Sequence, residues 1–185
     1  MAIKVGIIGA AGYTAGELIR LLIHHPEVEL CLLHSQSQAG LRVAEVHDDL
    51  WGDTDLRFTD QVDSTGLDVL FFCGGHGKTQ PFLSDHNIPS EVRLIDLSNE
   101  FRLHGPEHEF LYGLPEWQRE RLKQATHVAN PGCFATCIQL ALLPLARANQ
   151  LTHEIHVTAI TGSTGAGQRP SPTTHFSWRN NNLSV

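Results

Sequence analysis

The sequence predicts an α/β fold with a doubly wound, Rossmann-type parallel sheet. Short apolar runs alternate with segments of helical spacing over the first 150 residues, and this alternation favours strand–helix–strand units with parallel strands. The first apolar run, residues 3–8, leads into a turn with the spacing Gly9-x-x-Gly12-x-x-x-Gly16. A glycine turn between a strand and a helix is typical of nucleotide-binding folds.

Each element is predicted from its own pattern. Apolar runs bounded by turn residues predict strands at residues 3–8, 28–33, 67–73, 92–97 and 127–129. Helical spacing predicts helices at residues 13–24, 78–86, 117–125 and 133–148. Residues 153–160 alternate polar and apolar side chains and predict one more strand, and no regular element is expected after Gly167.

The change of pattern near residue 150 predicts a domain boundary. Residues 1–150 would form the nucleotide-binding domain, and residues 151–185 would belong to a second domain. A strand at residues 155–160 without its sheet partners would leave an open edge, which favours association between chains.

Composition narrows the class of protein. The 185 residues are 41% hydrophobic and 18% charged, and the net charge is −7 with histidines neutral, so nucleic-acid binding is not expected. No apolar run approaches the roughly 20 residues that a membrane helix needs. The N-terminus runs straight into a strand without the layout of a signal peptide, so we expect a cytoplasmic protein with its four cysteines reduced.

No metal site is expected. The twelve histidines are scattered, and the sequence contains neither Cys-x-x-Cys nor His-Glu-x-x-His.

The glycine turn predicts a site for a dinucleotide. Gly9 would allow the tight turn, Gly12 would let the backbone approach a pyrophosphate, and Gly16 would permit close contact between helix and strand. The N–H groups and the dipole at the helix start favour an anion there. A glycine turn without a ligand is the alternative.

The end of the second strand bears on the choice of cofactor. Residues 34–38 read His-Ser-Gln-Ser-Gln and include no carboxylate to hold the ribose hydroxyls of NAD. Hydroxyl and amide donors would suit a 2′-phosphate instead, and Arg42 is the nearest fixed positive charge along the sequence. The pattern therefore favours NADP.

Cys133 is the candidate nucleophile. It follows Asn130-Pro131-Gly132 and begins a predicted helix, where the dipole and the N–H groups stabilise a thiolate. The turn would lie at the carboxyl edge of the sheet, where ligands bind, and its N–H groups could hold an oxyanion.

The other three cysteines are expected to be buried small apolar side chains. Cys31 and Cys73 lie in predicted strands, and Cys137 lies one helical turn beyond Cys133. A resolving thiol is the alternative for Cys137.

Segments spread over nearly the whole chain share one ordered set of motifs. They are Gly9 to Leu18, Ala39-Gly40 with Glu45-Val46-His47, Asp96-Leu97-Ser98 with Phe101-Arg102-Leu103, Tyr112 to Glu116, Asn130 to Cys133, and Gly162 to Gly167. With these motifs the chain resembles the N-acetyl-γ-glutamyl-phosphate reductase family, NADP-dependent enzymes of arginine biosynthesis.

The resemblance implies an activity. The Cys133 thiolate would attack an acyl-phosphate substrate to form a thioester, and NADPH would reduce the thioester to a semialdehyde. Arg102 would bind the substrate carboxylate or phosphate, with a surface ion pair as its alternative. Glu116 would contact the substrate or order its own loop.

The resemblance also implies cofactor contacts and an oligomer. The residues that would line NADP are Gly9, Ala11, Gly12, Tyr13, Thr14, Ser35, Ser37, Gly74, Gly75, Gly77, Ser163, Gly165, Ala166 and Gly167. A homo-oligomer is expected for the full-length form. By the same resemblance, residues 151–185 would form the incomplete beginning of an α+β substrate domain.

Two departures from the family pattern matter. Gln36 stands where many relatives have a basic residue, and the acid–base histidine of the family lies beyond the stretch that matches residues 174–178, so His175 is not given that role. We therefore expect the chain to bind NADP and to be nearly inactive. Two alternatives stay open, an acyl-phosphate reductase like aspartate-semialdehyde dehydrogenase and a non-catalytic NADP-binding module.

Overall fold

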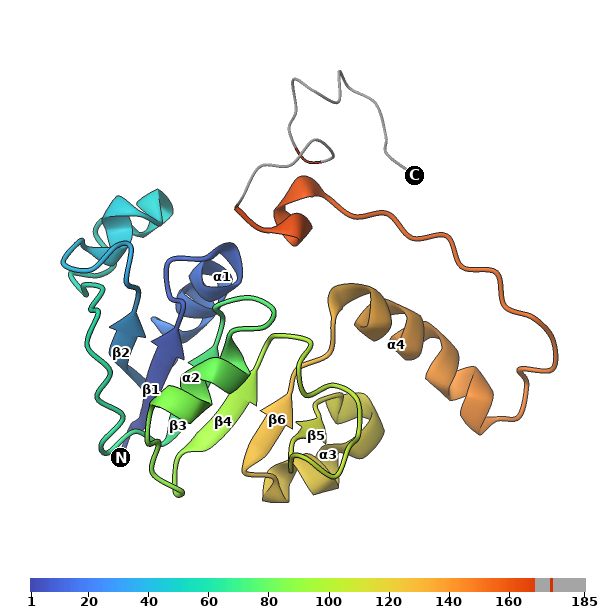
Figure 1. Ribbon diagram of the computed structural model, residues 1–185. Coiled ribbons are helices and arrows are strands. Elements are labelled where there is room, and N and C mark those ends of the chain that lie inside the picture. Colours follow the sequence, from blue (N-terminus) through green and yellow to red (C-terminus); the bar gives the residue numbers. More distant parts are fainter. Residues whose placement is uncertain (169–173, 175–185) are drawn as a thin grey trace. The chain divides into compact units, whose positions relative to one another are not determined.

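The computed structural model describes residues 1–168 and Thr174, and its main feature is a six-stranded sheet (Figure 1). The strand order is β2-β1-β3-β4-β6-β5, and every pair of neighbours is parallel. The strands are β1 Ile3–Ile8, β2 Val28–His34, β3 Val69–Phe72, β4 Arg93–Asp96, β5 Leu111–Tyr112 and β6 His127–Ala129. This arrangement confirms the predicted Rossmann-type sheet.

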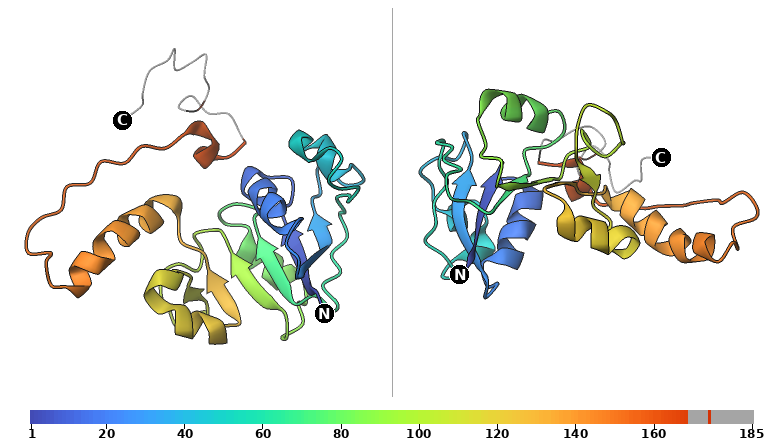
Figure 2. Two further views of the ribbon diagram at one scale, coloured as in Figure 1. Left: turned by 180° about the vertical axis from the view of Figure 1, so that it is seen from behind. Right: turned by 90° about the horizontal axis from the view of Figure 1, so that it is seen from below.

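The described helices are α1 Tyr13–Leu22, α2 Thr79–Asp85, α3 Pro115–Gln124 and α4 Cys133–Arg147, with the short 3₁₀ helices η1 Val43–Glu45, η2 Asp48–Leu50 and η3 Ser163–Ala166. Figure 2 shows α1 on one face of the sheet and α2 on the other. The sheet is therefore doubly wound, as predicted.

Two apolar clusters fill these faces. On the α1 face, Ile7 packs with Ile19 of α1 and with Val43 of η1, and each of the three is 0% exposed. On the other face, Leu70 and Phe72 of β3 belong to the cluster against which α2 packs. The alternation of side chains along the strands thus anchors a different helix on each side of the sheet.

The chain divides into two compact units, Met1–Glu154 and Ile155–Val185. The predicted boundary near residue 150 stays a prediction. His175 and most residues after Gly167 lie outside the part of the chain that the structure describes.

The predicted strand at residues 153–160 is wrong. These residues carry no strand assignment, because a strand needs a hydrogen-bonded neighbour and no other described segment pairs with them. The absence of a pairing partner for residues 155–160 among the described residues agrees with the expectation, and the association that an open edge would favour stays a prediction. Polar and apolar alternation alone cannot supply a partner.

Within residues 1–168 and Thr174, no helix is both long and apolar enough to cross a membrane.

The start of α2 is closed by a carboxylate from a neighbouring loop. Glu100 follows β4, and its carboxylate oxygens accept the backbone N–H groups of Lys78, Thr79 and Gln80, each at 2.9 Å. Partial burial raises the pKa of the Glu100 carboxyl, but these hydrogen bonds and the Ser98 hydroxyl more than offset that effect and hold the pKa below its usual value.

We predict that Glu100→Gln lowers the free energy of unfolding by about 1 kcal/mol at neutral pH, as for the loss of a helix cap. Because the pKa is depressed in the folded state, this stability is present above the ordinary glutamate value of about 4.3 and is lost as the pH falls through the folded value. Urea unfolding at a series of pH values measures the effect. The exposed Glu91→Gln is the matched control, and an equal loss in both variants would contradict the prediction.

Candidate functional site

The candidate site residues of the first unit follow the carboxyl ends of parallel strands and so share one edge of the sheet. From β2 to β6 along this edge come Ser35, the glycine turn at Gly9, the loop at Gly74, the loop at Arg102, and Cys133. In an open parallel sheet this edge is where ligands bind.

The glycine turn lies at the point where the strand order reverses. The chain passes from β1 to β2 and then returns to β3 on the other side of β1, and the crevice between such strands is the expected ligand site. Gly9 has a φ of 78°, and a Cβ there would lie 2.6 Å from the backbone of Gly74. Only glycine allows this turn and the close approach of the two loops.

The start of α1 is open to an anion. The structure shows no side-chain cap, and among the described residues no hydrogen bond is made by the N–H groups of Tyr13, Thr14 and Ala15 to another segment. The side chains of Tyr13 and Thr14 are exposed. A helix start without a cap beside a glycine turn fits the pyrophosphate of a dinucleotide.

The end of β2 holds the turn from one side. The carbonyl oxygen of His34 accepts the N–H groups of Gly9 and Ala10 at 3.0 and 2.9 Å. Ser35 is buried and its N–H donates to the Thr59 carbonyl, whereas Ser37 is exposed. Ser35 thus directly follows the residue that holds the glycine turn, and Ser37 lies two residues further along the chain.

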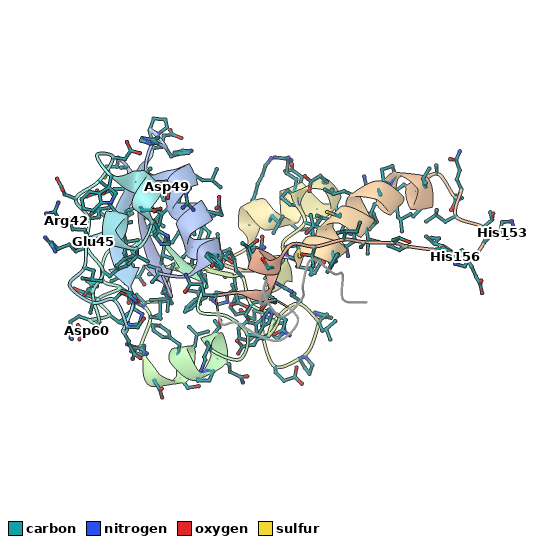
Figure 3. All side chains as sticks on the ribbon, turned by 90° about the horizontal axis from the view of Figure 1, so that it is seen from above. Arg42, Glu45, Asp49, Asp60, His153 and His156 are labelled. Atoms are coloured by element: carbon teal, nitrogen blue, oxygen red, sulfur yellow. The ribbon has the colours of Figure 1, made fainter. Side chains whose placement is uncertain are left out.

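Arg42 lies at the outer edge of the fold (Figure 3). Its guanidinium is 3.7 Å from the carboxylate of Asp55 and lies 5.9 Å from the centre of the Trp51 ring. The residue that is the nearest positive charge along the sequence is thus engaged with an acid and an aromatic ring.

The cysteine turn is held by the last residue of β4. The Asn130 N–H donates to the Asp96 carbonyl at 2.7 Å, and Cys133 is exposed at the first position of α4. Gly132 precedes the helix without a side-chain cap. In the described part of the chain, the N–H groups of Cys133 and Phe134 make no hydrogen bond outside the helix. They are therefore open to a ligand at the start of α4, where the Cys133 thiol lies.

Arg102 contacts the backbone of this turn. Its Nε donates to the Asn130 carbonyl at 2.9 Å and its Nη2 donates to the Leu97 carbonyl at 3.0 Å. A Cβ at Gly132 would lie 2.8 Å from Nη1, so glycine gives the guanidinium its space. Among the described residues Arg102 makes no ion pair, and its role toward a substrate stays a prediction.

Two of the three expectations for the other cysteines are wrong. Cys31 is exposed between the buried Leu30 and Leu32 of β2. Cys137 is exposed because α4 buries none of its residues. Cys73 is partly buried at the end of β3, and burial and the nearby Asp96 raise the pKa of its thiol to about 12.

Glu116 takes no part in these contacts. Glu116 is exposed in the first turn of α3, and no hydrogen bond or ion pair among the described residues joins it to the cysteine turn. In the second unit, the loop from Ser163 to Gly167 forms the 3₁₀ helix η3. No group of three or more potential metal ligands occurs in residues 1–168 and Thr174.

The sequence analysis assigned no role to Glu100 and none to His47. Glu100 caps α2 across about 20 residues, and the His47 ring lies 3.1 Å from the Ala10 carbonyl across 37 residues. Local spacing carries no signal for such contacts. The only signal was that His47 belongs to one of the shared motifs.

Comparison with protein families gives two matches. Residues 4–125 match the family described as semialdehyde dehydrogenase, NAD binding domain, and residues 133–185 match the family described as semialdehyde dehydrogenase, dimerisation domain.

Relatives from two bacteria are named "N-acetyl-gamma-glutamyl-phosphate reductase". The protein of Bacteroides thetaiotaomicron is 59% identical over 183 residues, which are 99% of this chain and 57% of the relative. That of Parabacteroides distasonis is 57% identical over the same shares. The chain thus spans little more than half the length of these relatives.

Solved structures of lower identity share the fold. Aspartate semialdehyde dehydrogenase II of Vibrio cholerae, complexed with ASA, has a TM-score of 0.60 at 21% identity, covering 80% of this chain and 47% of that chain. Aspartate semialdehyde dehydrogenase of Candida albicans, solved with NADP, has a TM-score of 0.56 at 17% identity, covering 81% and 48%. With a family match over most of its length, a parallel Rossmann-type sheet and an open helix start at the switch point, the chain belongs to the semialdehyde dehydrogenase NAD-binding domain family.

Proposed function

We propose that the chain is the NADP-binding and nucleophile-bearing part of an N-acetyl-γ-glutamyl-phosphate reductase. The observation that carries the proposal is the shared sheet edge, where the open start of α1 and the open start of α4, with Cys133, follow parallel strands. The relatives at 59% and 57% identity support this substrate over aspartyl phosphate, because the aspartate semialdehyde dehydrogenases are only 21% and 17% identical.

The chain's own residues would carry the acyl-transfer half of the reaction. The Cys133 sulfur attacks the acyl carbon, the carbon–sulfur bond forms, and the bond to the phosphate oxygen breaks so that inorganic phosphate leaves with the electron pair. The N–H groups at the start of α4 would stabilise the oxyanion. Bound NADPH would supply the hydride that converts the thioester to the aldehyde and frees the thiolate.

Arg102 would assist this step from its position against the backbone of the cysteine turn. Its Nε and Nη2 are occupied by the Asn130 and Leu97 carbonyls, while Nη1 lies against Gly132, beside the cysteine. A guanidinium in this position can attract an acyl phosphate while it holds the backbone. Glu116 is exposed in the first turn of α3, and a contact with the substrate or a role in ordering its own loop stays a prediction.

The preference for NADP is part of the proposal. Ser35 and Ser37 follow β2 beside the glycine turn, and neither Ser nor Gln in residues 34–38 adds a negative charge. The predicted contacts of Gly74, Gly75 and Gly77, and of Ser163 to Gly167, complete the proposed cofactor site.

The proposal extends to the setting of the enzyme. A cytoplasmic location would keep the Cys133 thiol reduced. The match of residues 133–185 to a dimerisation domain supports a homo-oligomer, as do the exposed Phe134, Leu140 and Leu145 on α4. A nearly inactive chain, and the rival of a binding module without catalysis, stay predictions.

Acyl transfer can be tested without turnover. We predict that N-acetyl-γ-glutamyl phosphate, mixed with the chain in the absence of NADPH, acylates Cys133 and releases phosphate, because only the thiol and the turn are needed for this half-reaction. Mass spectrometry detects the adduct, and hydroxylamine should remove it. Cys133→Ser is the control, β-aspartyl phosphate tests the rival substrate, and an adduct that persists in Cys133→Ser would reject Cys133.

Alkylation should rank the thiols. We predict that iodoacetamide modifies Cys133 fastest, because it lies exposed at a helix start. Cys73 should react slowest, because its pKa is raised to about 12. Peptide mass spectrometry gives the rates, with Cys137 as the internal control on the same helix, and NADP should slow the reaction at Cys133. Equal rates at Cys133 and Cys137 would count against an activated nucleophile.

Cofactor choice can be tested with Ser35→Asp. A carboxylate there would repel a 2′-phosphate but could accept from a ribose hydroxyl, so NADPH affinity should fall by at least about tenfold while NADH affinity is maintained. Fluorescence titration measures both. Because Ser35 is 6% exposed, thermal unfolding is recorded in parallel, and Ser90→Asp at an exposed turn controls for net charge. Unchanged NADPH affinity in folded Ser35→Asp would defeat the assignment.

A further inference from the structure

His47 is a buried side chain at the glycine turn that has no part in the proposed chemistry. It comes from the η segment, defined here as residues 43–50, and it is 6% exposed. Its Nε2 lies 3.1 Å from the carbonyl oxygen of Ala10. Since a carbonyl oxygen only accepts, Nε2 carries a proton and donates it. Ala10 itself is 0% exposed, so this buried carbonyl depends on the imidazole for a partner.

The same imidazole also contacts the first turn of α1. A Cβ at Gly16 would lie 2.7 Å from Cε1 of His47 and 2.8 Å from Nδ1. The expectation that Gly16 permits close contact between helix and strand is therefore wrong, because the space at Gly16 is filled by the His47 ring. The His47 side chain thus contacts the chain before and after residues 13–15, at Ala10 and at Gly16. The N–H groups of residues 13–15 form the open helix start.

The η segment is fastened to α1 independently of any ligand. Val43 and Leu50 are 0% and 3% exposed in the same apolar cluster as Ile19 of α1. Arg20 of α1 donates to both carboxylate oxygens of Asp49, from Nε and from Nη2, each at 2.6 Å. Figure 3 shows Asp49 beside α1. The position of His47 is thus set by packing and by a bidentate ion pair.

The hydrogen bond to Ala10 orients the turn. A trans peptide is planar, so the Ala10 carbonyl and the N–H group of the next residue lie in one plane. The hydrogen bond to His47 fixes the orientation of this plane and therefore the path of the backbone into α1. The carbonyl of His34 holds the Gly9 and Ala10 N–H groups from the side of β2. The turn is therefore held from two directions, by a backbone acceptor and by a side-chain donor.

We propose that His47 is a positioning residue for the cofactor phosphates. It holds the Ala10 peptide and, through its contact with Gly16, the first turn of α1 in the orientation in which the helix start binds an anion. The inference rests on the proposed binding of NADP.

The test compares NADPH affinity in three variants by fluorescence titration. His47→Leu keeps an apolar side chain but removes the donor, and its affinity should fall by about tenfold, the order expected when a buried carbonyl loses its partner. His47→Gln places an amide N–H near the position of Nε2 and should restore most of the affinity. Gly16→Ala keeps His47 in the chain but displaces its ring, so affinity should fall again.

Val92→Ala is the matched control for a general loss of stability, because Val92 is 2% exposed in the cluster on the opposite face of the sheet. Unfolding midpoints without cofactor establish that its stability loss equals that of His47→Leu. The positioning role is wrong if the two variants then bind NADPH equally, or if His47→Gln binds no better than His47→Leu. If His47→Leu does not fold, Gly16→Ala and His47→Gln decide the question. An unaltered chain that binds no NADPH would overturn the proposed function and this inference with it.

Discussion

The parallel direction of all six strands is the constraint on which the candidate site depends. Because every strand ends at the same edge, segments that are more than 120 residues apart along the chain, the turn at Gly9 and the turn at Cys133, face a common side of the sheet. They are not neighbours there, since β3 and β4 lie between β1 and β6. Three strand spacings amount to about 14 Å. A ligand that reaches from one turn to the other must be elongated, as a dinucleotide is.

The helix starts along this edge differ in how their N–H groups are used. At α2 the Glu100 carboxylate already occupies the position of an anion, and α3 begins with Pro115, which has no N–H to offer. Of the described α-helices, only α1 and α4 begin without a carboxylate cap or a proline. The two open starts coincide with the glycine turn and with the cysteine. The two helix starts that are open to an anion are thus the same two that the sequence motifs indicated.

Local patterns predicted the parts of the fold that local physics determines. The apolar runs of β1 and β6 and the start of α4 at Cys133 were found because burial and turn chemistry leave a mark on neighbouring residues. The two-residue strand Leu111–Tyr112 was missed because it is too short to show a period. The strand at residues 153–160 was predicted wrongly because its pattern says nothing of a pairing partner. The exposure of Cys137 depends on what covers α4, which no spacing within the helix encodes.

The features that the sequence could not reveal share one physical origin. A turn that presents N–H groups to a ligand points carbonyl groups into the protein, and a buried carbonyl needs a donor. At the glycine turn His47 donates to Ala10 and fills the space left by Gly16. At the cysteine turn Arg102 donates to Asn130 and fills the space left by Gly132. In each case a glycine that belongs to a local motif leaves the space that a side chain from a distant segment occupies. Such a glycine cannot be interpreted from its own neighbours, because what it accommodates is chosen by the tertiary fold.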